Sequence, residues 1–228
     1  MKLIIGALLP AIILMGYIYK KDTLEKESPG ILLKCLLGGC LAALAAIILE
    51  AILEGVFSLT FSGLLYTLAS NFVGVALVEE AAKLFFCWLF VWKSREFNYR
   101  FDGVVYMAFT SLGFAAFENV LYAISYGTGV LFSRAIFAIP AHLSFAIFLG
   151  SYFGTAKMYA VRGHKGKAQN LVMYGLLQSV LLHGFYDFCL TVGSLWLTLA
   201  FYVFVILMDI LTIRRIRRDS EADSPIYG

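Results

Sequence analysis

Charged side chains are scarce in this sequence. They make up 14% of its 228 residues, whereas 61% of the residues are hydrophobic. An ordinary soluble domain has about 25% charged and about 45–50% apolar residues. A chain of this length cannot bury so much apolar surface in a soluble core, so a soluble globular domain is excluded and lipid is the expected solvent.

Cysteine is scarce as well, and its spacing argues against the common cysteine-based metal sites. The four cysteines, Cys35, Cys40, Cys87 and Cys189, lie in or beside apolar runs and show no Cys-x-x-Cys pattern. We interpret them as small buried hydrophobic residues. The sequence also shows no internal repeat and no low-complexity segment.

Long apolar runs predict an all-α, polytopic transmembrane helix bundle in the cell membrane. A helix of about 20 apolar residues crosses the hydrocarbon core, and the sequence has about seven such runs. An eighth span stays open, because 55–67 fits either a loop or an extension of the third span. Pro140 predicts a kink in the fifth span. The predicted spans are 3–19, 31–53, 66–92, 103–124, 131–157, 169–191 and 195–213, within a single domain over 1–218.

Basic residues gather in alternate loops. Fifteen of the 18 Lys and Arg residues lie in 20–34, 93–102, 157–168 and 214–218. The positive-inside rule therefore predicts an N-terminus outside the cell and a C-terminus in the cytoplasm. These clusters are short and flank membrane spans, so membrane lipid and not nucleic acid is the expected partner. The polar tail, 219–228, is predicted to be disordered.

Five ionisable residues lie inside the apolar runs: Glu79, Glu80, Glu118, His142 and His183. A charged side chain in the membrane centre costs at least ~2.5–3.5 kcal/mol, so it requires a partner or a wet cavity and indicates a functional site. At 1.5 Å per residue, all five lie at similar depths, in the middle to outer half of a ~30 Å core. We therefore expect them to share one site.

The glutamate pair is followed by Lys83, four residues after Glu79 and three after Glu80. At this spacing on a helix the ammonium can reach one or both carboxylates. Adjacent side chains point about 100° apart, so we expect one carboxylate to face a cavity and the other to be bound to Lys83 or a neighbouring helix. The pair suits a general base or acid, or a buried salt bridge that only fixes packing.

The fourth span contains Glu118 one turn after Phe114, and Asn119 follows directly. Glu118 either takes part in chemistry, holds a histidine in one tautomer, or binds another helix. Asn119 either stabilises an oxyanion or makes an interhelical hydrogen bond, which is the more common role.

The two histidines lie in later spans. His142 follows Pro140, and His183 is one turn before Asp187, whose carboxylate can therefore orient the ring. Two intramembrane histidines together with three glutamates favour a functional set over isolated packing contacts. The remaining histidine, His164, lies in a basic loop and is interpreted as solvated.

This ordered set resembles the PrsW family of membrane proteases, which is similar to the CAAX prenyl proteases and to bacteriocin-processing membrane proteins. The resemblance extends from about Leu3 to Arg218. Lys83 stands where the prenyl proteases have Arg, and Glu118 where they have His, which favours the PrsW branch. The matching motifs are Glu79-Glu80 with Lys83, Phe114-x-x-x-Glu118 with Asn119, His142, and His183-x-x-x-Asp187.

The resemblance implies a membrane-embedded endopeptidase that makes the first, extracytoplasmic cut in a single-pass membrane protein such as an anti-sigma factor. We expect water to be the nucleophile and Glu79 or Glu80 to be the general base, with Glu79 preferred. His142 or His183 would stabilise the carbonyl oxygen or hold the water. Glu118 and Asp187 would orient these histidines.

Three other functions use the same residue types. Glu79, Glu118, His142 and His183 could bind zinc, but the sequence has no His-Glu-x-x-His motif, so we expect no cofactor. A proton-coupled transporter or channel also contains intramembrane Glu, His and Lys, but this chain is short and has no obvious inverted repeat. The third alternative is a scaffold that binds a partner helix without catalysis.

Overall fold

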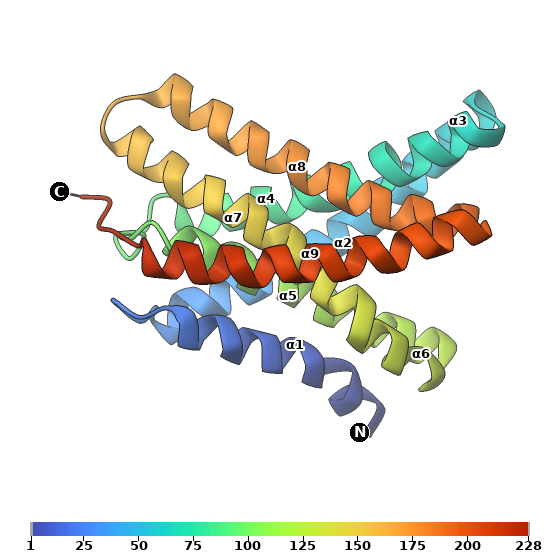
Figure 1. Ribbon diagram of the computed structural model, residues 1–228, viewed down its shortest axis with the longest axis horizontal. Helices are drawn as coiled ribbons and strands as arrows, with labels where there is room; N and C mark the ends of the chain where they lie inside the picture. Colours follow the sequence, from blue (N-terminus) through green and yellow to red (C-terminus); the bar gives the residue numbers. More distant parts are fainter. Residues whose placement is uncertain (1, 228) are drawn as a thin grey trace.

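The computed structural model describes residues 2–227, with side chains from Leu3 onward. This part of the chain forms seven helical rods and no β-strand (Figure 1). Two rods change from α-helix to π-helix and back without a break. The elements are α1 (Lys2–Lys21), α2 (Pro29–Thr60), α3 (Gly63–Leu68), η1 (Ala69–Leu77), α4 (Val78–Val91), α5 (Asp102–Tyr126), α6 (Gly129–Ser133), η2 (Arg134–Ala138), α7 (Ile139–Val161), α8 (Lys165–Val192) and α9 (Leu195–Glu221).

The predicted all-α membrane bundle is confirmed. Each predicted span corresponds to one rod, and within residues 2–227 there is no eighth. Six rods are long and apolar enough to cross a membrane. The remaining rod, Gly63–Val91, contains Glu79, Glu80 and Lys83. The segment 55–67 comprises the end of α2, a short turn and the start of α3.

Helix α5 forms the centre of the bundle. Its residues 102–115 are all buried, and glycines allow both neighbouring helices to approach it closely. A Cβ on Gly39 of α2 would lie 2.0 Å from the carbonyl oxygen of Thr110, and one on Gly154 of α7 would lie 1.9 Å from that of Arg100. Since a side chain would keep the backbones apart, Gly39 lets α2 lie directly against α5, and Gly154 lets α7 lie directly against the residues at the start of α5.

The outer surface is apolar. Large hydrophobic side chains such as Ile13, Ile48 and Val203 are exposed on α1, α2 and α9. Exposed apolar surface of this extent suits lipid and not water. The chain is therefore a multi-pass protein of the cell membrane.

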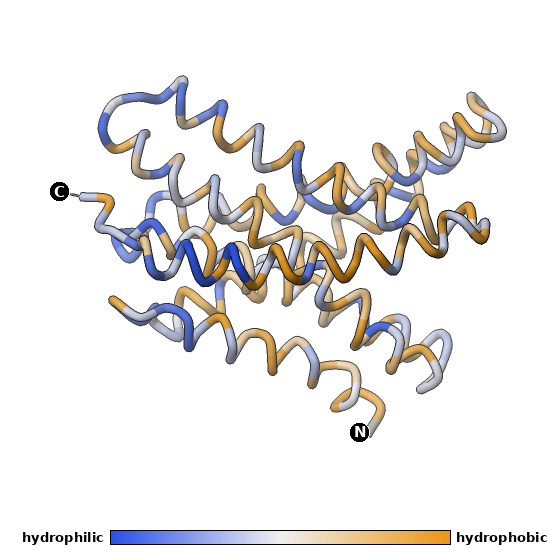
Figure 2. Tube along the Cα trace, in the orientation of Figure 1, coloured by the Kyte–Doolittle hydropathy of each residue, from blue (hydrophilic) through white to orange (hydrophobic). Residues whose placement is uncertain are grey.

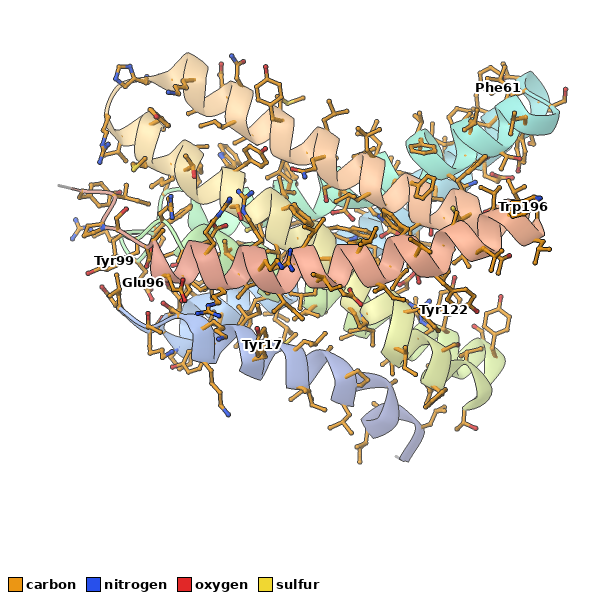
Figure 3. The ribbon with its side chains drawn as sticks, viewed as in Figure 1. Tyr17, Phe61, Glu96, Tyr99, Tyr122 and Trp196 are labelled. Atoms are coloured by element: carbon orange, nitrogen blue, oxygen red, sulfur yellow. The ribbon has the colours of Figure 1, made fainter. Side chains whose placement is uncertain are left out.

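The two ends of the bundle differ in polarity. The connections 22–28, 92–101 and 162–164 and the C-terminus lie together at the left in Figure 2, where the polar segments gather. Phe61 and Trp196 lie at the opposite end from Tyr99 and Glu96 (Figure 3). The basic loops thus share one end, as their alternation predicts.

The C-terminal segment is more ordered than its composition predicts. Helix α9 continues to Glu221, and the Asp223 carboxylate then accepts a hydrogen bond from the amide of Phe101 (2.8 Å). Ile226 is buried, and its amide donates to the carbonyl of Asn98 (2.7 Å). The structure therefore differs from the expected disorder of 219–228, because one apolar side chain and one carboxylate bind the tail to the 98–101 loop. Gly228 lies outside the described residues.

Several carboxyl groups are buried together near the same end. Glu27 and Asp22, in the α1–α2 connection, are almost fully buried, and the Tyr106 hydroxyl donates a hydrogen bond to Glu27. Burial, reinforced by the neighbouring Asp102 carboxylate, raises the pKa of Glu27 to about 9. Burial also raises the pKa of Asp22 to about 6. The folded state thus binds these protons more tightly than the unfolded chain does.

The raised pKa of Glu27 predicts that stability falls as pH rises. A carboxyl group whose folded pKa exceeds its unfolded value stabilises the fold fully below the unfolded pKa, and this contribution is lost as pH rises through the folded pKa. The thermal unfolding temperature in detergent should therefore decrease between about pH 5 and pH 9. Glu27→Gln, which cannot ionise, should flatten this decrease, whereas exposed Glu96→Gln should not. Equal slopes for wild type and Glu27→Gln would contradict the assignment.

Candidate active site

A buried ammonium group lies at the centre of the polar cluster. Lys83 is fully buried, and its Nζ lies 2.9 Å from Oε2 of Glu79 and 2.8 Å from Oε1 of Glu80. The same Nζ is 3.2 Å from Nδ1 of His142 and 4.0 Å from the centre of the Phe114 ring. These contacts connect α4 to α5 and α7.

Both glutamates of the pair bind Lys83, which is one of the two arrangements that their spacing allows, and only Glu79 faces the cavity. Glu79 and Glu80 lie four and three residues before Lys83, so both are its neighbours one helical turn away. The long lysine side chain therefore reaches both carboxylates. Where the two glutamates differ is in access to the cavity, which follows from their other contacts.

Glu80 is sealed inside the protein. It is fully buried, its Oε1 contacts Lys83 and His183, and its Oε2 accepts a hydrogen bond from Ser179 of α8 (2.9 Å). Both carboxylate oxygens are therefore occupied. Glu79 instead lines a cavity, and its contacts with Lys83 and His183 both use Oε2.

His183 lies between carboxylates. Its Nδ1 is 2.9 Å from Oε1 of Glu80, and its Nε2 is 3.2 Å from Oδ2 of Asp187 and 4.0 Å from Oε2 of Glu79. The Phe145 ring stacks on the imidazole at 4.7 Å between centroids. An imidazolium donates from both nitrogens, so this arrangement suits the protonated ring, with Asp187 orienting it as its spacing predicts.

His142 is held in one tautomer by its neighbours. The Lys83 ammonium can only donate, so the facing Nδ1 must accept and the proton resides on Nε2. Nε2 in turn lies 3.2 Å from Oε2 of Glu118, to which it donates. The contact expected between Glu118 and a histidine is therefore present. Ser111 of α5 donates to the backbone carbonyl of His142 (2.8 Å) and fixes the start of α7.

Arg134 belongs to this site, although its position in the sequence suggests an exposed residue at the outer end of a span. One guanidinium nitrogen lies 2.5 Å from Oε2 of Glu118, and Nε donates to Oδ1 of Asn119 (2.8 Å). The guanidinium also lies 3.9 Å from the centre of the Tyr122 ring. Asn119 donates to the carbonyl of Ala7 in α1 (2.6 Å), so its contacts are interhelical.

Both π-helical segments directly precede site residues. Segment η1 ends at Leu77, just before Glu79, and η2 ends at Ala138, four residues before His142. Pro140 follows η2 within the same continuous rod, where a proline removes one backbone N–H from the helix. A π-bulge rotates the residues that follow it around the helix axis and is frequent at functional sites.

The site opens into a cavity of about 580 Å³. Glu79, Glu118, His142, His183 and Asp187 line it, whereas Glu80, Lys83 and Asn119 do not. Further lining residues, Ser133, Thr191 and Tyr202, lie near the end of the bundle opposite the basic loops.

Sequence reasoning missed one acidic residue of this cavity. Glu50 of α2 also lines the cavity, and it lies inside the apolar run 31–53. The rule that selected Glu79 and Glu118, that a charge within an apolar span indicates a site, applies to it equally.

Comparison with known proteins gives a consistent result. A family profile described as PrsW family intramembrane metalloprotease matches residues 27–212. Curated proteins named Protease PrsW are similar to this chain over most of its length. The one from Oceanobacillus iheyensis is 33% identical over 212 residues, 93% of each chain. The one from Geobacillus kaustophilus is 33% identical over 196 residues, 85% of this chain and 82% of the relative. The one from Bacillus subtilis is 32% identical over 211 residues, 89% of this chain and 90% of the relative. No solved structure matches the chain.

The contacts of Lys83 predict a large stability loss when its charge is removed. Lys83→Met keeps the length of the side chain but leaves Glu79 and Glu80 buried without their cation, which should destabilise the fold by roughly 3–5 kcal/mol. Thermal and denaturant unfolding in detergent measure this loss, with exposed Lys93→Met as the control. A Lys83→Met protein as stable as wild type would show that the two carboxylates do not depend on the ammonium.

Proposed function

We infer that this chain, which belongs to the PrsW family of intramembrane proteases, is a glutamate-type endopeptidase in which Glu79 activates water. Membership in the family makes the protein a membrane-embedded peptidase. The observation that carries the glutamate mechanism is the contrast within the pair. Glu79 lines the cavity through which water can arrive, while both oxygens of Glu80 are occupied by buried partners.

The proposed reaction begins with a water molecule beside Glu79. The carboxylate takes a proton from this water as its oxygen bonds to the scissile carbonyl carbon, which leaves a tetrahedral intermediate with a negatively charged oxygen. Glu79 then passes the proton to the amide nitrogen, the C–N bond breaks, and a carboxylic acid and an amine leave. Lys83 binds Oε2 of Glu79, so Oε1 is the oxygen available to the water.

The histidines supply hydrogen-bond donors for the oxyanion. His142 and His183 both line the cavity, and the Nε2–H group of each is bonded to a carboxylate, Glu118 for the former and Asp187 for the latter. In the proposed reaction one of these N–H groups turns from its carboxylate to the oxyanion. The two carboxylates therefore act as positioning residues in this proposal.

The metal named in the family description fits poorly at the centre of this site. Glu79, Glu80 and His183 offer three ligand atoms within 4.8 Å of one another, which alone resembles a metal site. The Lys83 ammonium, however, already lies 2.9 and 2.8 Å from oxygens of the two carboxylates. A divalent ion on these oxygens would place a second cation against a buried first one. We therefore derive no step through a metal.

We propose that the substrate is a single-pass membrane protein, such as an anti-sigma factor, cut on its extracytoplasmic side. Several residues that line the cavity lie near the end of the bundle that carries the turns at 61–62, 127–128 and 193–194. By the positive-inside rule, that end faces the outside of the cell. Reaching the site from there exposes the least peptide backbone to hydrocarbon, where its hydrogen bonds would be unsatisfied.

The contrast within the glutamate pair predicts different defects. With enzyme and a panel of single-pass membrane proteins reconstituted in liposomes, Glu79→Gln should lower kcat by at least roughly 100-fold, the usual contribution of a general base. It should lower the unfolding temperature less than Glu80→Gln does, because Glu79 borders the cavity and Glu80 does not. Glu80→Gln should lower both activity and unfolding temperature, because it weakens a buried network. Near-normal cleavage by Glu79→Gln would refute its role as the base.

The metal-free mechanism predicts resistance to chelation. Cleavage by the purified enzyme should survive prolonged treatment with EDTA and 1,10-phenanthroline, because Lys83 and not an ion neutralises the two glutamates. Metal analysis of the same preparation provides an independent readout. Loss of cleavage that added zinc restores would establish the metal-dependent alternative.

The proposed orientation predicts where the products end. Mass spectrometry should place the new termini in the extracytoplasmic juxtamembrane segment of the cleaved protein or in the outer turn of its span. A cut on the cytoplasmic side would contradict both the orientation and the assigned class of substrate.

A further inference from the structure

One carboxyl group in the cavity lacks the partner that each of the others has. Glu79 is bound to Lys83, Glu118 to Arg134 and His142, and Asp187 to His183. Glu50 of α2 also lines the cavity, but its Oε1 is buried and has no hydrogen-bond partner in the described part of the chain. No base or acid role is assigned to it in the proposed reaction.

An unpaired buried carboxyl oxygen is costly. Leaving a buried polar group unsatisfied costs about 1–3 kcal/mol, and more when the group is charged. Glu50 also lies near other negative groups of the cavity, Glu79 and Glu118, which adds to this cost when the carboxyl is ionised. Rotation of the carboxyl group toward the cavity that Glu50 lines would bring this oxygen to a hydrogen-bond donor of a ligand and remove the cost, so the position favours binding.

Glu50 also lies where two hollows adjoin. A second cavity of about 330 Å³ lies between α2 and η1, and Glu50 and Val75 line both it and the larger cavity. Ser70 and Glu54 line only the second. An extended polypeptide that passes from one cavity into the other would therefore run directly past Glu50.

Glu54 shows what a satisfied carboxylate looks like on the same helix face. It lies one turn after Glu50 and is exposed, and it accepts hydrogen bonds from the Tyr66 hydroxyl and from Ser70 (3.4 Å). Both residues are glutamates on the same face of α2. They differ because the protein supplies hydrogen-bond donors to Glu54 and none to Oε1 of Glu50. Because Glu54 itself lines the second cavity, the control for loss of a carboxylate is the exposed Glu96 of the 92–101 loop.

We propose that Glu50 is a substrate-binding residue, whose carboxyl oxygen accepts a hydrogen bond from an N–H group of the polypeptide in the cavity. The proposal rests on the protease function above and deepens it. A peptide at membrane depth needs acceptors for backbone N–H groups that pair with water elsewhere. The donor is either a backbone amide or the side chain of a substrate lysine or arginine, since both present the same N–H chemistry.

The test measures binding and turnover separately. The probe is the single-pass protein of the panel that the wild-type enzyme cleaves. In the inactive Glu79→Gln background, Glu50→Leu should weaken binding of this probe roughly tenfold or more, the equivalent of one hydrogen bond to a charged group. In the active enzyme it should raise KM with kcat within about twofold, the pattern of lost uniform binding. Glu50→Gln should give a smaller increase, and Glu96→Gln, at an exposed position in the 92–101 loop, should change neither quantity.

Stability separates binding from a structural role. If Glu50 serves the substrate, Glu50→Leu should unfold at the same temperature as wild type or higher, because it removes an unsatisfied polar group. Lower unfolding temperatures for both Glu50→Leu and Glu50→Gln, or probe binding within about twofold of the parent, would overturn the proposal. Normal cleavage by Glu79→Gln would contradict the proposed protease mechanism itself. Normal probe binding by Glu50→Leu would contradict only the role of Glu50.

A second probe identifies the donor. Lysines and arginines near the cut are replaced by glutamine, and the effect of Glu50→Leu on binding is measured again. A backbone donor leaves the effect unchanged, whereas a side-chain donor abolishes it. In the second case Glu50 selects substrates with a basic residue near the cut.

Discussion

The ion cluster around Lys83 is the constraint on which the rest of the structure depends. An ammonium and two carboxylates are costly to transfer into a low-dielectric interior unless they lie in contact and their remaining hydrogen-bonding positions are filled. Here His142 of α7 faces the ammonium, and Ser179 and His183 of α8 bind Glu80. Helices α4, α7 and α8 can therefore pack with few alternative registers, since a shift of any one would leave a buried charge unpaired.

Exposure increases from the centre of the cluster toward the cavity. Lys83 and Glu80 are fully buried and Glu79 is 5% exposed, whereas the side chains of Glu118 and Asp187 are 23% and 24% exposed. The inner groups are fixed by one another, and the outer groups position histidines that face the hollow. In the proposed mechanism, Glu79 lines the cavity and is also held in place by the buried Lys83 ammonium, so the base has both access to water and a defined orientation.

The apolar runs predicted the number and order of the rods because hydrocarbon requires long helices and tolerates little else. The same physics selected Glu79, Glu118, His142 and His183, since a charge within a span is rarely accidental. Sequence spacing could not reveal Arg134, because its partner Glu118 lies on another helix and only packing brings the two together. It also could not show which glutamate is sealed, because Ser179 is 99 residues from Glu80. The polar composition of the tail led to a prediction of disorder. A single apolar residue, Ile226, is buried and anchors the tail.

The position of Lys83 also decides how the chemistry divides among the residues. A metal ion in a protease neutralises carboxylates and polarises the carbonyl through an open coordination position. The ammonium here neutralises Glu79 and Glu80 and donates to His142, but it is fully buried and so has no contact with the cavity. In the proposed mechanism, polarisation of the carbonyl comes from groups that do line the cavity. The Nε2–H groups of His142 and His183, which bind carboxylates in the free enzyme, turn to the substrate oxygen. In this arrangement charge neutralisation and electrophilic assistance, which one metal would combine, are assigned to separate residues on α4, α7 and α8.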